Sequence, residues 1–324
     1  MTYTYLNPKI ALMGAGCVKE IGIQAKNLGG TKALIVSGKS RHGEKLAEDI
    51  RKILENAGLK AVIFAGADPN PTDISVMEGA EIYKKENCNM IVAVGGGSPM
   101  DCAKAVGIVA YNGGRINDYE GAGKVTKGIP PLITVNTTAD TASEMTCFSV
   151  ITDTERRIKM PICDPLITAD VAVNDPELML SMPPDLTAAT GMDALTHAVE
   201  AYVSTMATPT TDAAAIKAIE LVSKYLREAV AHGDDIRARD MMAHAEYLAG
   251  VAFNNAFLGY VHSMAHQLGG LYDLPFNNPL FLCTASLHGP YFLQSNTLST
   301  DSKVIALNLL NSDPYNAPEI FSYT

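Results

Sequence analysis

Short apolar runs alternate with amphipathic stretches through the first half of the chain, and no other sequence feature constrains the fold as strongly. The apolar runs have the length of strands and cover residues 9–13, 33–37, 60–64, 90–94, 132–135 and 170–174. Helical patterns fill the gaps at 17–28, 42–58, 73–87 and 100–111. Continuous apolar strands separated by helices are typical of a mainly parallel sheet covered on both faces. A hairpin is predicted at 148–161, just before the last of these strands.

The second half of the chain has a different pattern, in which helical periodicity dominates. The predicted helices cover residues 185–204, 209–230, 235–257 and 259–272. Short breaks of Pro, Gly and Asp separate them. The sequence therefore predicts an α/β domain over residues 1–182 and an all-α domain over 183–324. After residue 275 no clean period remains, and 276–324 is expected to be loop with one helix near 301–310.

Composition and charge narrow the possible functions. No apolar run approaches the length of a membrane span, and the N-terminal residues lack a basic segment followed by an apolar one, so the cytoplasm is expected. The net charge of −10 argues against nucleic-acid binding. The six cysteines occur singly, with no Cys-x-x-Cys pair, and are expected to be reduced thiols.

Two residue pairs in the helical half have the spacing of metal ligands. Asp193 and His197 are four residues apart, as are His262 and His266, so each pair lies on one face of its helix. The helix around Asp193 has almost no polar face, and a buried aspartate needs a partner. Two such helices facing each other can bring a carboxylate and imidazoles to a divalent metal. The alternative is that Asp193 only hydrogen-bonds His197.

Glycine-rich loops offer two candidate nucleotide sites. The segment Gly95, Gly96, Gly97 and Ser98 follows a buried strand and opens a helix, so its backbone can approach a pyrophosphate at the helix N-terminus. Asp101 ends this motif. The earlier 14–16 segment, Gly-Ala-Gly, lacks the third glycine of a dinucleotide fingerprint and is expected to be a simple turn.

A hydroxyl-rich loop follows the strand at 132–135. It contains Thr137, Thr138 and Thr141 and would lie at the carboxyl edge of the sheet, where open α/β sheets bind their ligands. Its hydroxyl groups suit contacts with a ribose or a phosphate. A polar turn without a ligand is the alternative that composition leaves open.

Taken together, these motifs resemble the iron-dependent (group III) alcohol dehydrogenases, nearest the branch of 1,3-propanediol and NAD-dependent methanol dehydrogenases. The resemblance covers roughly residues 5–275. It rests on the segments 95–101, 136–144, 186–202 and 252–270. It implies a Rossmann-like domain followed by a helical domain, the architecture shared with dehydroquinate synthase. It also implies one divalent metal, most often Fe²⁺ with Zn²⁺ or Mg²⁺ as alternatives, and NAD, with NADP possible.

The resemblance also assigns roles to individual residues. Asp193, His197 and His262 match metal ligands, and His266 matches a histidine near the nicotinamide that is assigned to proton transfer. The residues that match cofactor contacts are Gly38, Gly95, Gly96, Gly97, Ser98, Asp101, Thr137, Thr138, Thr141 and Lys159.

Three positions depart from the family pattern. Phe276 stands where the family has a fourth ligand, a histidine, and beyond it the resemblance ends, which predicts a truncated or altered C-terminus and weakened metal binding. His288 could substitute. Asp140 stands where the family loop usually has glycine, so its charge would repel a pyrophosphate unless the side chain turns away. Gly38 replaces an aspartate typical of NAD-preferring relatives, which predicts relaxed NAD/NADP preference, with Lys39 and Arg41 close by.

The sequence therefore predicts a metal-dependent NAD(P) alcohol dehydrogenase acting on short primary alcohols or diols, or their aldehydes. A homo-oligomer is expected from the resemblance. Two alternatives remain: a catalytically impaired member that keeps its nucleotide site, and a lyase of the dehydroquinate synthase type.

Overall fold

The computed structural model describes residues 2–272, and its main sheet confirms the predicted parallel α/β fold. Six strands lie in the order β1-β9-β6-β4-β2-β3, and every neighbouring pair is parallel. Their bounds are β1 Ile10–Met13, β2 Lys32–Gly38, β3 Lys60–Ala67, β4 Met90–Gly95, β6 Leu132–Asn136 and β9 Val171–Asn174. The strand positions agree closely with the predicted apolar runs.

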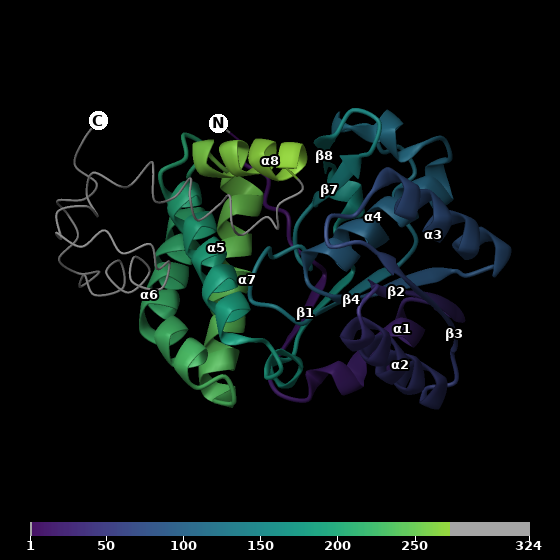
Figure 1. Ribbon diagram of the computed structural model, residues 1–324, viewed down its shortest axis with the longest axis horizontal. Coiled ribbons are helices and arrows are strands. Elements are labelled where there is room, and N and C mark those ends of the chain that lie inside the picture. The colour runs from purple at the N-terminus through teal and green to yellow at the C-terminus, as the bar shows by residue number, and fades with distance from the viewer. Residues whose placement is uncertain (1, 273–324) are drawn as a thin grey trace.

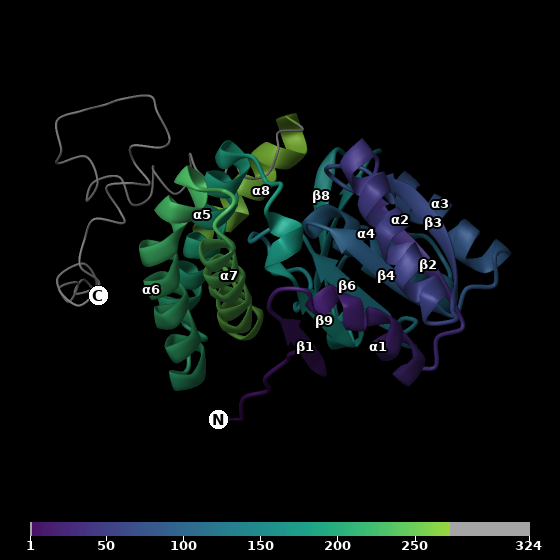
Figure 2. The ribbon, with the colours of Figure 1, turned by 90° about the horizontal axis from the view of Figure 1, so that it is seen from below.

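Helices cover both faces of this sheet, as Figure 2 shows. In β2, Ala33 and Ile35 pack on the side of α1 (Ile21–Asn27) and α2 (Arg41–Asn56), whereas Leu34 and Val36 pack on the side of α3 and α4. All four side chains are fully buried, because a strand in the middle of such a sheet has no solvent face. The bounds of the other two helices are α3 Asp73–Lys85 and α4 Gly97–Asn112.

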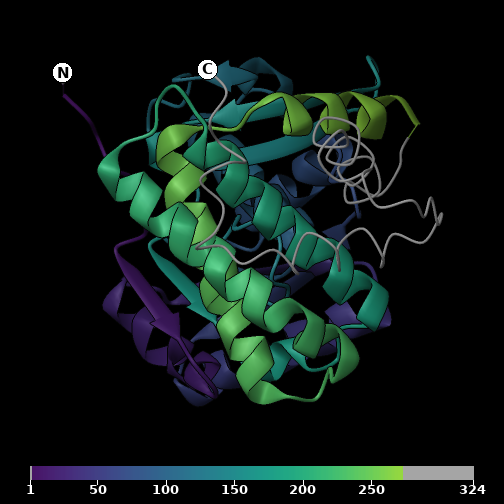
Figure 3. The same cartoon turned by 90° about the vertical axis from the view of Figure 1, so that its left-hand side faces the viewer.

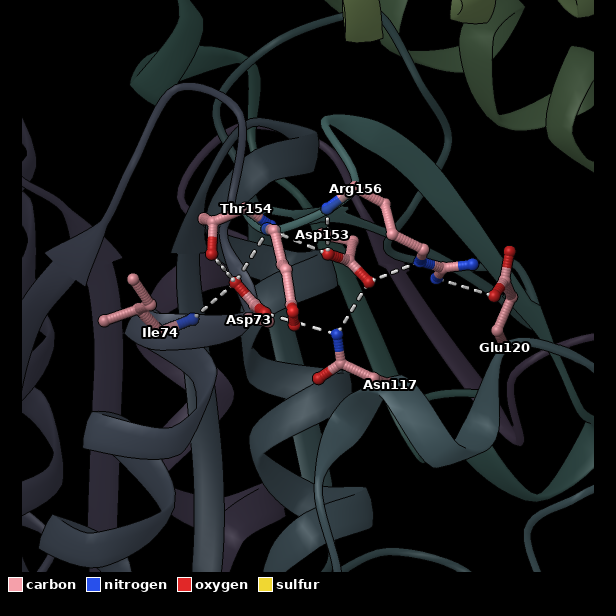
Figure 4. A network of polar contacts seen from close by, with 8 residues as sticks. Asp73, Ile74, Asn117, Glu120, Asp153, Thr154 and Arg156 are labelled. Carbon is pink, nitrogen blue, oxygen red and sulfur yellow. Dashed lines mark hydrogen bonds and ion pairs between the residues drawn. The ribbon is translucent and has the colours of Figure 1, made fainter.

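A second, smaller sheet contains the predicted hairpin, formed by β7 (Phe148–Asp153) and β8 (Ile158–Cys163). The two-residue strand β5 (Gly121–Ala122) joins β8 and is too short to be recognised from periodicity. A network of polar contacts fixes the hairpin to the N-terminus of α3 (Figure 4). Nδ2 of Asn117 donates to Asp73 at 3.2 Å and to Asp153 at 2.9 Å. Arg156 pairs with Asp153 and Glu120.

The predicted helical half forms four helices within the described residues, and they gather on one side of the sheet (Figure 1). Their bounds are α5 Pro184–Tyr202, α6 Pro209–Ala231, α7 Ile236–Ala256 and α8 Tyr260–Tyr272. In Figure 3, α8 crosses one end of the others. Gly191 permits the close approach of α5 to α6, because a Cβ there would lie 2.2 Å from Leu226 Cδ1.

Several sequence predictions lie outside the described residues. These are the tail from 276 onward with its expected helix near 301–310, the statements about Phe276 and His288, and the reduced state expected of the sixth cysteine, Cys283. Within residues 2–272, none of the five cysteines forms a disulfide. In the same range no helix has the length and apolar character needed to cross a membrane.

Candidate functional site

The strand order identifies where a ligand belongs on the main sheet. From β2 the chain moves to β3 on one side and then to β4 on the other, so the order of connections reverses between β2 and β4. Doubly wound sheets bind ligands outside the carboxyl ends of the strands at such a point. Gly38 ends β2, and Gly95 ends β4. Two of the predicted cofactor positions therefore flank this point.

The glycine loop after β4 packs directly against the threonine loop after β6. A Cβ on Gly96 would lie 3.0 Å from Thr138 Oγ1, and one on Gly97 would lie 2.6 Å from Thr141 Oγ1. The structure thus brings together the two loops that the sequence predicted separately. Helix α4 begins at Gly97, and no side chain caps its N-terminus. Its first N–H groups are available to an anion such as a phosphate.

Other predicted cofactor residues already have protein partners. Ser98 Oγ donates to the carbonyl of Pro69 at 2.5 Å, and Lys159 Nζ donates to Asn70 Oδ1 at 2.5 Å. The carboxylate of Asp101 accepts hydrogen bonds from Ser143 Oγ at 2.6 Å and from the Val150 amide at 2.9 Å. Asp101 therefore joins α4 to the loop before β7 and to β7 itself. Its predicted contact with the cofactor stays a prediction, as do those of the other two.

Backbone amides at the 14–16 turn are already bound within the protein, so they are not available to a phosphate. The carboxylate of Asp175 accepts the amide of Gly16 at 3.0 Å and the amide of Val18 at 3.1 Å. Both glycines have positive φ, of 112° at Gly14 and 79° at Gly16, as a tight turn requires. A protein carboxylate therefore takes the amides that a pyrophosphate would need.

The predicted metal ligands meet at one point between α5 and α8. Asp193, His197 and His262 are all buried, and one ligand atom from each lies within 4.8 Å of the others. Nε2 of His262 is 3.3 Å from Oδ1 of Asp193, and Nε2 of His197 is 3.7 Å from the same oxygen. Neither oxygen of Asp193 accepts a well-aligned hydrogen bond, although both are fully buried. Two imidazoles and a buried carboxylate that accepts no well-aligned hydrogen bond are a donor set that fits a divalent cation.

The electrostatics of this cluster agree with cation binding. Burial lowers the pKa of His197 to about 4, so its imidazole is neutral, as a metal ligand must be. Burial opposes ionisation of Asp193, but the neighbouring histidines outweigh it and lower the pKa of this carboxyl. Burial also acts against protonation of His262, yet Asp193 and Glu200 raise its pKa to about 9. His262 can therefore either carry a proton that pairs with Asp193 or, after losing that proton, bind a cation together with Asp193.

Glu200 belongs to this cluster and was missed by the sequence analysis. Its Oε2 lies 2.5 Å from Nδ1 of His262, and its Oε1 accepts the amide of Val261 at 2.7 Å. A carboxylate on the far nitrogen of a metal-ligating histidine fixes the ring orientation. The spacing could have shown it, because Glu200 is three residues after His197 and seven after Asp193, on the same helical face.

Aromatic packing orients the two ligand histidines. The His197 ring stacks on Phe253 with centroids 4.3 Å apart and on His262 at 4.4 Å. His266 lies next to them, with its ring centroid 6.3 Å from that of His262. Burial lowers the pKa of His266 to about 3, so this side chain is neutral.

Asp140 turns toward the metal residues. Its side chain interacts with Asp193 and is among the groups that lower the pKa of Asp193 against the effect of burial. Its backbone forms a hydrogen bond with His197. This is the orientation under which the sequence analysis expected less repulsion of a pyrophosphate, and that expectation stays a prediction. The residue instead connects the threonine loop to α5 and places a second carboxyl beside Asp193.

The fold and the site together define an α/β protein with a candidate metal site beside the carboxyl edge of its sheet. A sequence profile described as iron-containing alcohol dehydrogenase matches residues 8–176. A second, described as Fe-containing alcohol dehydrogenase family, C-terminal, matches residues 187–303. The chain therefore belongs to the iron-containing alcohol dehydrogenase family, whose members are oxidoreductases acting on alcohols.

Individual relatives agree with the branch that the motifs indicated. The NAD-dependent methanol dehydrogenase of Bacillus methanolicus is 53% identical over 267 residues, which cover 82% of this chain and 70% of that protein. The 1,3-propanediol dehydrogenase of Citrobacter freundii is 50% identical over 84% of this chain and 71% of its own length. A crystal structure of 1,3-propanediol oxidoreductase superposes with a TM-score of 0.85 at 42% identity, covering 96% of this chain and 85% of that one. The lyase and the impaired-enzyme alternatives gain no support from these matches.

Proposed function

We propose that this protein is a metal-dependent dehydrogenase that transfers a hydride between a short primary alcohol or diol and NAD(P). The observation that carries the proposal is the convergence of Asp193, His197 and His262 within 4.8 Å. The threonine loop reaches this cluster through Asp140, so the metal residues and the predicted cofactor residues are neighbours. The named substrates of the relatives, methanol and 1,3-propanediol, support the substrate class.

The chain's own residues have definable roles in such a reaction. When bound, the divalent cation would lower the pKa of the alcohol hydroxyl and the nicotinamide would accept the hydride. Glu200 and Phe253 hold the His262 and His197 rings in position. His266 adjoins the His262 ring and is proposed as a proton relay; because burial lowers its pKa to about 3, it would hand the released proton on to solvent rather than hold it.

The nitrogen and oxygen donors also bear on the identity of the metal. Imidazole suits both iron and zinc, whereas magnesium prefers oxygen ligands alone. Two histidines with one carboxylate form the set typical of non-haem Fe(II) sites. We therefore propose Fe²⁺ in preference to Zn²⁺, and both in preference to Mg²⁺.

A direct experiment tests this function. The protein is loaded anaerobically with Fe²⁺ or Zn²⁺, its metal content is measured, and NADH absorbance is followed with methanol, 1,3-propanediol or butanol. We expect metal-dependent NADH formation with at least one of these alcohols. Metal-loaded protein that forms no NADH or NADPH with any of them, and reduces none of the aldehydes, would contradict the proposal.

Gly97→Ala tests the cofactor loop. The new Cβ would lie 2.6 Å from Oγ1 and 2.8 Å from Cγ2 of Thr141, so the threonine loop must shift away from α4. We expect KM for NAD to rise about tenfold, corresponding to roughly 1.4 kcal/mol of lost binding. Metal content should change less than KM, since Asp193 and both histidines lie on α5 and α8 and only Asp140 of the threonine loop reaches them. An unchanged KM would show that the cofactor does not use this pair of loops.

Asp68→Asn tests the cofactor preference. Asp68 directly follows β3 at the edge beside Gly38, and its Oδ1 lies 2.6 Å from Lys39 Nζ. This carboxylate neutralises Lys39, which could otherwise form an ion pair with the 2′-phosphate of NADP. We expect the variant to raise kcat/KM for NADP relative to NAD by about fivefold, equivalent to roughly 1 kcal/mol. Asp49→Asn, which changes an exposed partner of Lys52, is the matched control and should leave the ratio unchanged.

Two further expectations belong to this proposal. Cytoplasmic localisation rests on the sequence composition, and assembly into a homo-oligomer rests on the resemblance. Fractionation and light scattering, respectively, would test them.

A further inference from the structure

Two carboxyl groups lie buried against each other where α7 of the helical domain meets the sheet. Glu246 projects from α7, and Glu144 belongs to the threonine loop between β6 and β7. Both side chains are 0% exposed. Buried acids are rare unless they are paired, so two together require an explanation.

A chain of side-chain amides connects the two acids. Nδ2 of Asn136 donates to Oε1 of Glu246 at 3.3 Å and also to Oδ1 of Asn174 at 2.9 Å. Nδ2 of Asn174 donates to Oε1 of Glu144 at 3.0 Å. The Oε1 atom of each acid is thereby satisfied. Both asparagines end strands, Asn136 at β6 and Asn174 at β9, so this chain runs along the carboxyl edge of the sheet.

The second oxygen of each acid has no well-aligned donor, and the two acids interact directly with each other. Oε2 of Glu144 and Oε2 of Glu246 accept no well-aligned hydrogen bond, although both atoms are buried. Burial raises the pKa of both acids, and the Glu144 carboxylate raises that of Glu246 further. Two adjacent buried carboxyls cannot both ionise cheaply, so one keeps its proton and donates it to the other.

The charged groups around the pair do not replace that proton. Asp140 adds further negative charge from the same loop, and Tyr247 is the titratable neighbour on α7. Lys104 of α4 is the nearby cation. Its Nζ donates to the carbonyls of Phe148 at 2.7 Å and Thr146 at 2.9 Å, and no hydrogen bond joins it to either acid.

Glu246 also fixes the shape of the loop. Its Oε1 accepts the amide of Ala142 at 2.7 Å, and Ala142 has a φ of 50°, which is unfavourable for a residue with a Cβ. One turn along α7, Gly250 leaves room for the loop, since a Cβ there would lie 2.6 Å from Ala142 Cβ. The loop is thus seated on α7 by a hydrogen bond and by a close contact.

We propose that Glu246 is a positioning residue that works as a neutral acid, sharing its proton with Glu144 to hold the threonine loop on α7. The loop carries Thr137, Thr138 and Thr141 toward the cofactor and Asp140 toward the metal residues. Glu246 therefore sets the distance between the two halves of the site. The inference rests on the proposed function only in that the loop contacts NAD(P).

Two substitutions separate the neutral acid from an ionised one. Glu246→Gln keeps an oxygen for Ala142 and Asn136 and offers an N–H to Glu144, so we expect KM for NAD within about twofold of the parent at pH 7. Glu246→Leu leaves those donors unpaired, and we expect KM to rise about tenfold with kcat less affected. A Glu246→Gln protein as impaired as Glu246→Leu would overturn the proposal, because it would show that a negative charge is needed.

The pH dependence of unfolding tests the shared proton without using activity. In the folded protein Glu246 retains a proton that the unfolded chain releases above about pH 4.5. The free energy of unfolding therefore decreases as the pH rises from about 4.5 to the raised pKa of Glu246 in the folded protein. In that window we expect the Tm of the parent to fall relative to that of Glu246→Gln by about 2 °C per pH unit. The control Glu228→Gln, at an exposed acid of α6, should follow the parent.

Parallel Tm curves for the parent and Glu246→Gln would show that no extra proton is held, and they would refute the proposal. Because this readout needs neither metal nor substrate, its outcome is independent of the proposed dehydrogenase activity.

Discussion

Replacing Asp193 with asparagine is expected to yield a folded protein that has lost its metal and oxidises alcohols on the order of a thousandfold more slowly. The substitution preserves the shape of a fully buried side chain but removes the charge that draws Nε2 of His197 and His262 together. Without an anionic oxygen, two imidazoles hold a divalent cation weakly. Metal analysis after dialysis and NADH formation measure the two effects.

The matched control for this experiment is Asp185→Asn, the same change at an exposed position of α5. It should leave both metal content and turnover at the level of the parent. If Asp193→Asn retained its metal after dialysis, the assignment of this carboxylate as a ligand would be wrong.

Glu200→Ala is expected to weaken metal affinity about 10–100-fold, the range typical of residues that orient a ligand histidine. The variant removes the acceptor on Nδ1 of His262 and also the acceptor for the Val261 amide at the start of α8. We therefore also expect a lower Tm, since that amide is buried. Titration with Zn²⁺ against a competing chelator measures the affinity.

Two companion variants separate the effects of Glu200→Ala. Glu200→Gln keeps one acceptor and should lie between the parent and alanine in both measurements. Glu220→Ala, at a partly exposed acid of α6 paired with Lys217, should change neither. Equal metal affinity in Glu200→Ala and the parent would show that the His262 ring is oriented by packing alone.

The sequence predicted this fold well because its local patterns agree with its tertiary structure. Strands such as β4 are continuous apolar runs, and they are buried on both faces as expected. Small differences arise at element ends. The helix expected at 17–28 divides into a short 3₁₀ turn at Cys17–Glu20 and α1, and α4 starts at Gly97 rather than at residue 100. Neither changes the topology.

The site was only partly predictable, because helical spacing reports on one helix at a time. The spacing placed His197 next to Asp193, but the position of His262 beside them depends on how α8 packs on α5. The same limit hid Glu200, which acts on a residue of another helix. It also hid the Glu144–Glu246 pair, whose members are about a hundred residues apart and meet only when α7 packs against the loop after β6.

Asp140 is a position where the sequence could not give the direction of the side chain. As a replacement for glycine in a nucleotide loop, it predicted repulsion of the cofactor. In the folded protein its side chain interacts with Asp193, so the substitution concerns the metal residues as much as the nucleotide.

The central claim is that Asp193, His197 and His262 bind one divalent cation. Anomalous diffraction from crystals grown with Fe²⁺ or Zn²⁺ measures this directly. The account predicts a single strong peak about 2.0–2.2 Å from an oxygen of Asp193 and from a nitrogen of each histidine. A peak elsewhere, or one that leaves Asp193 outside the coordination sphere, would contradict it.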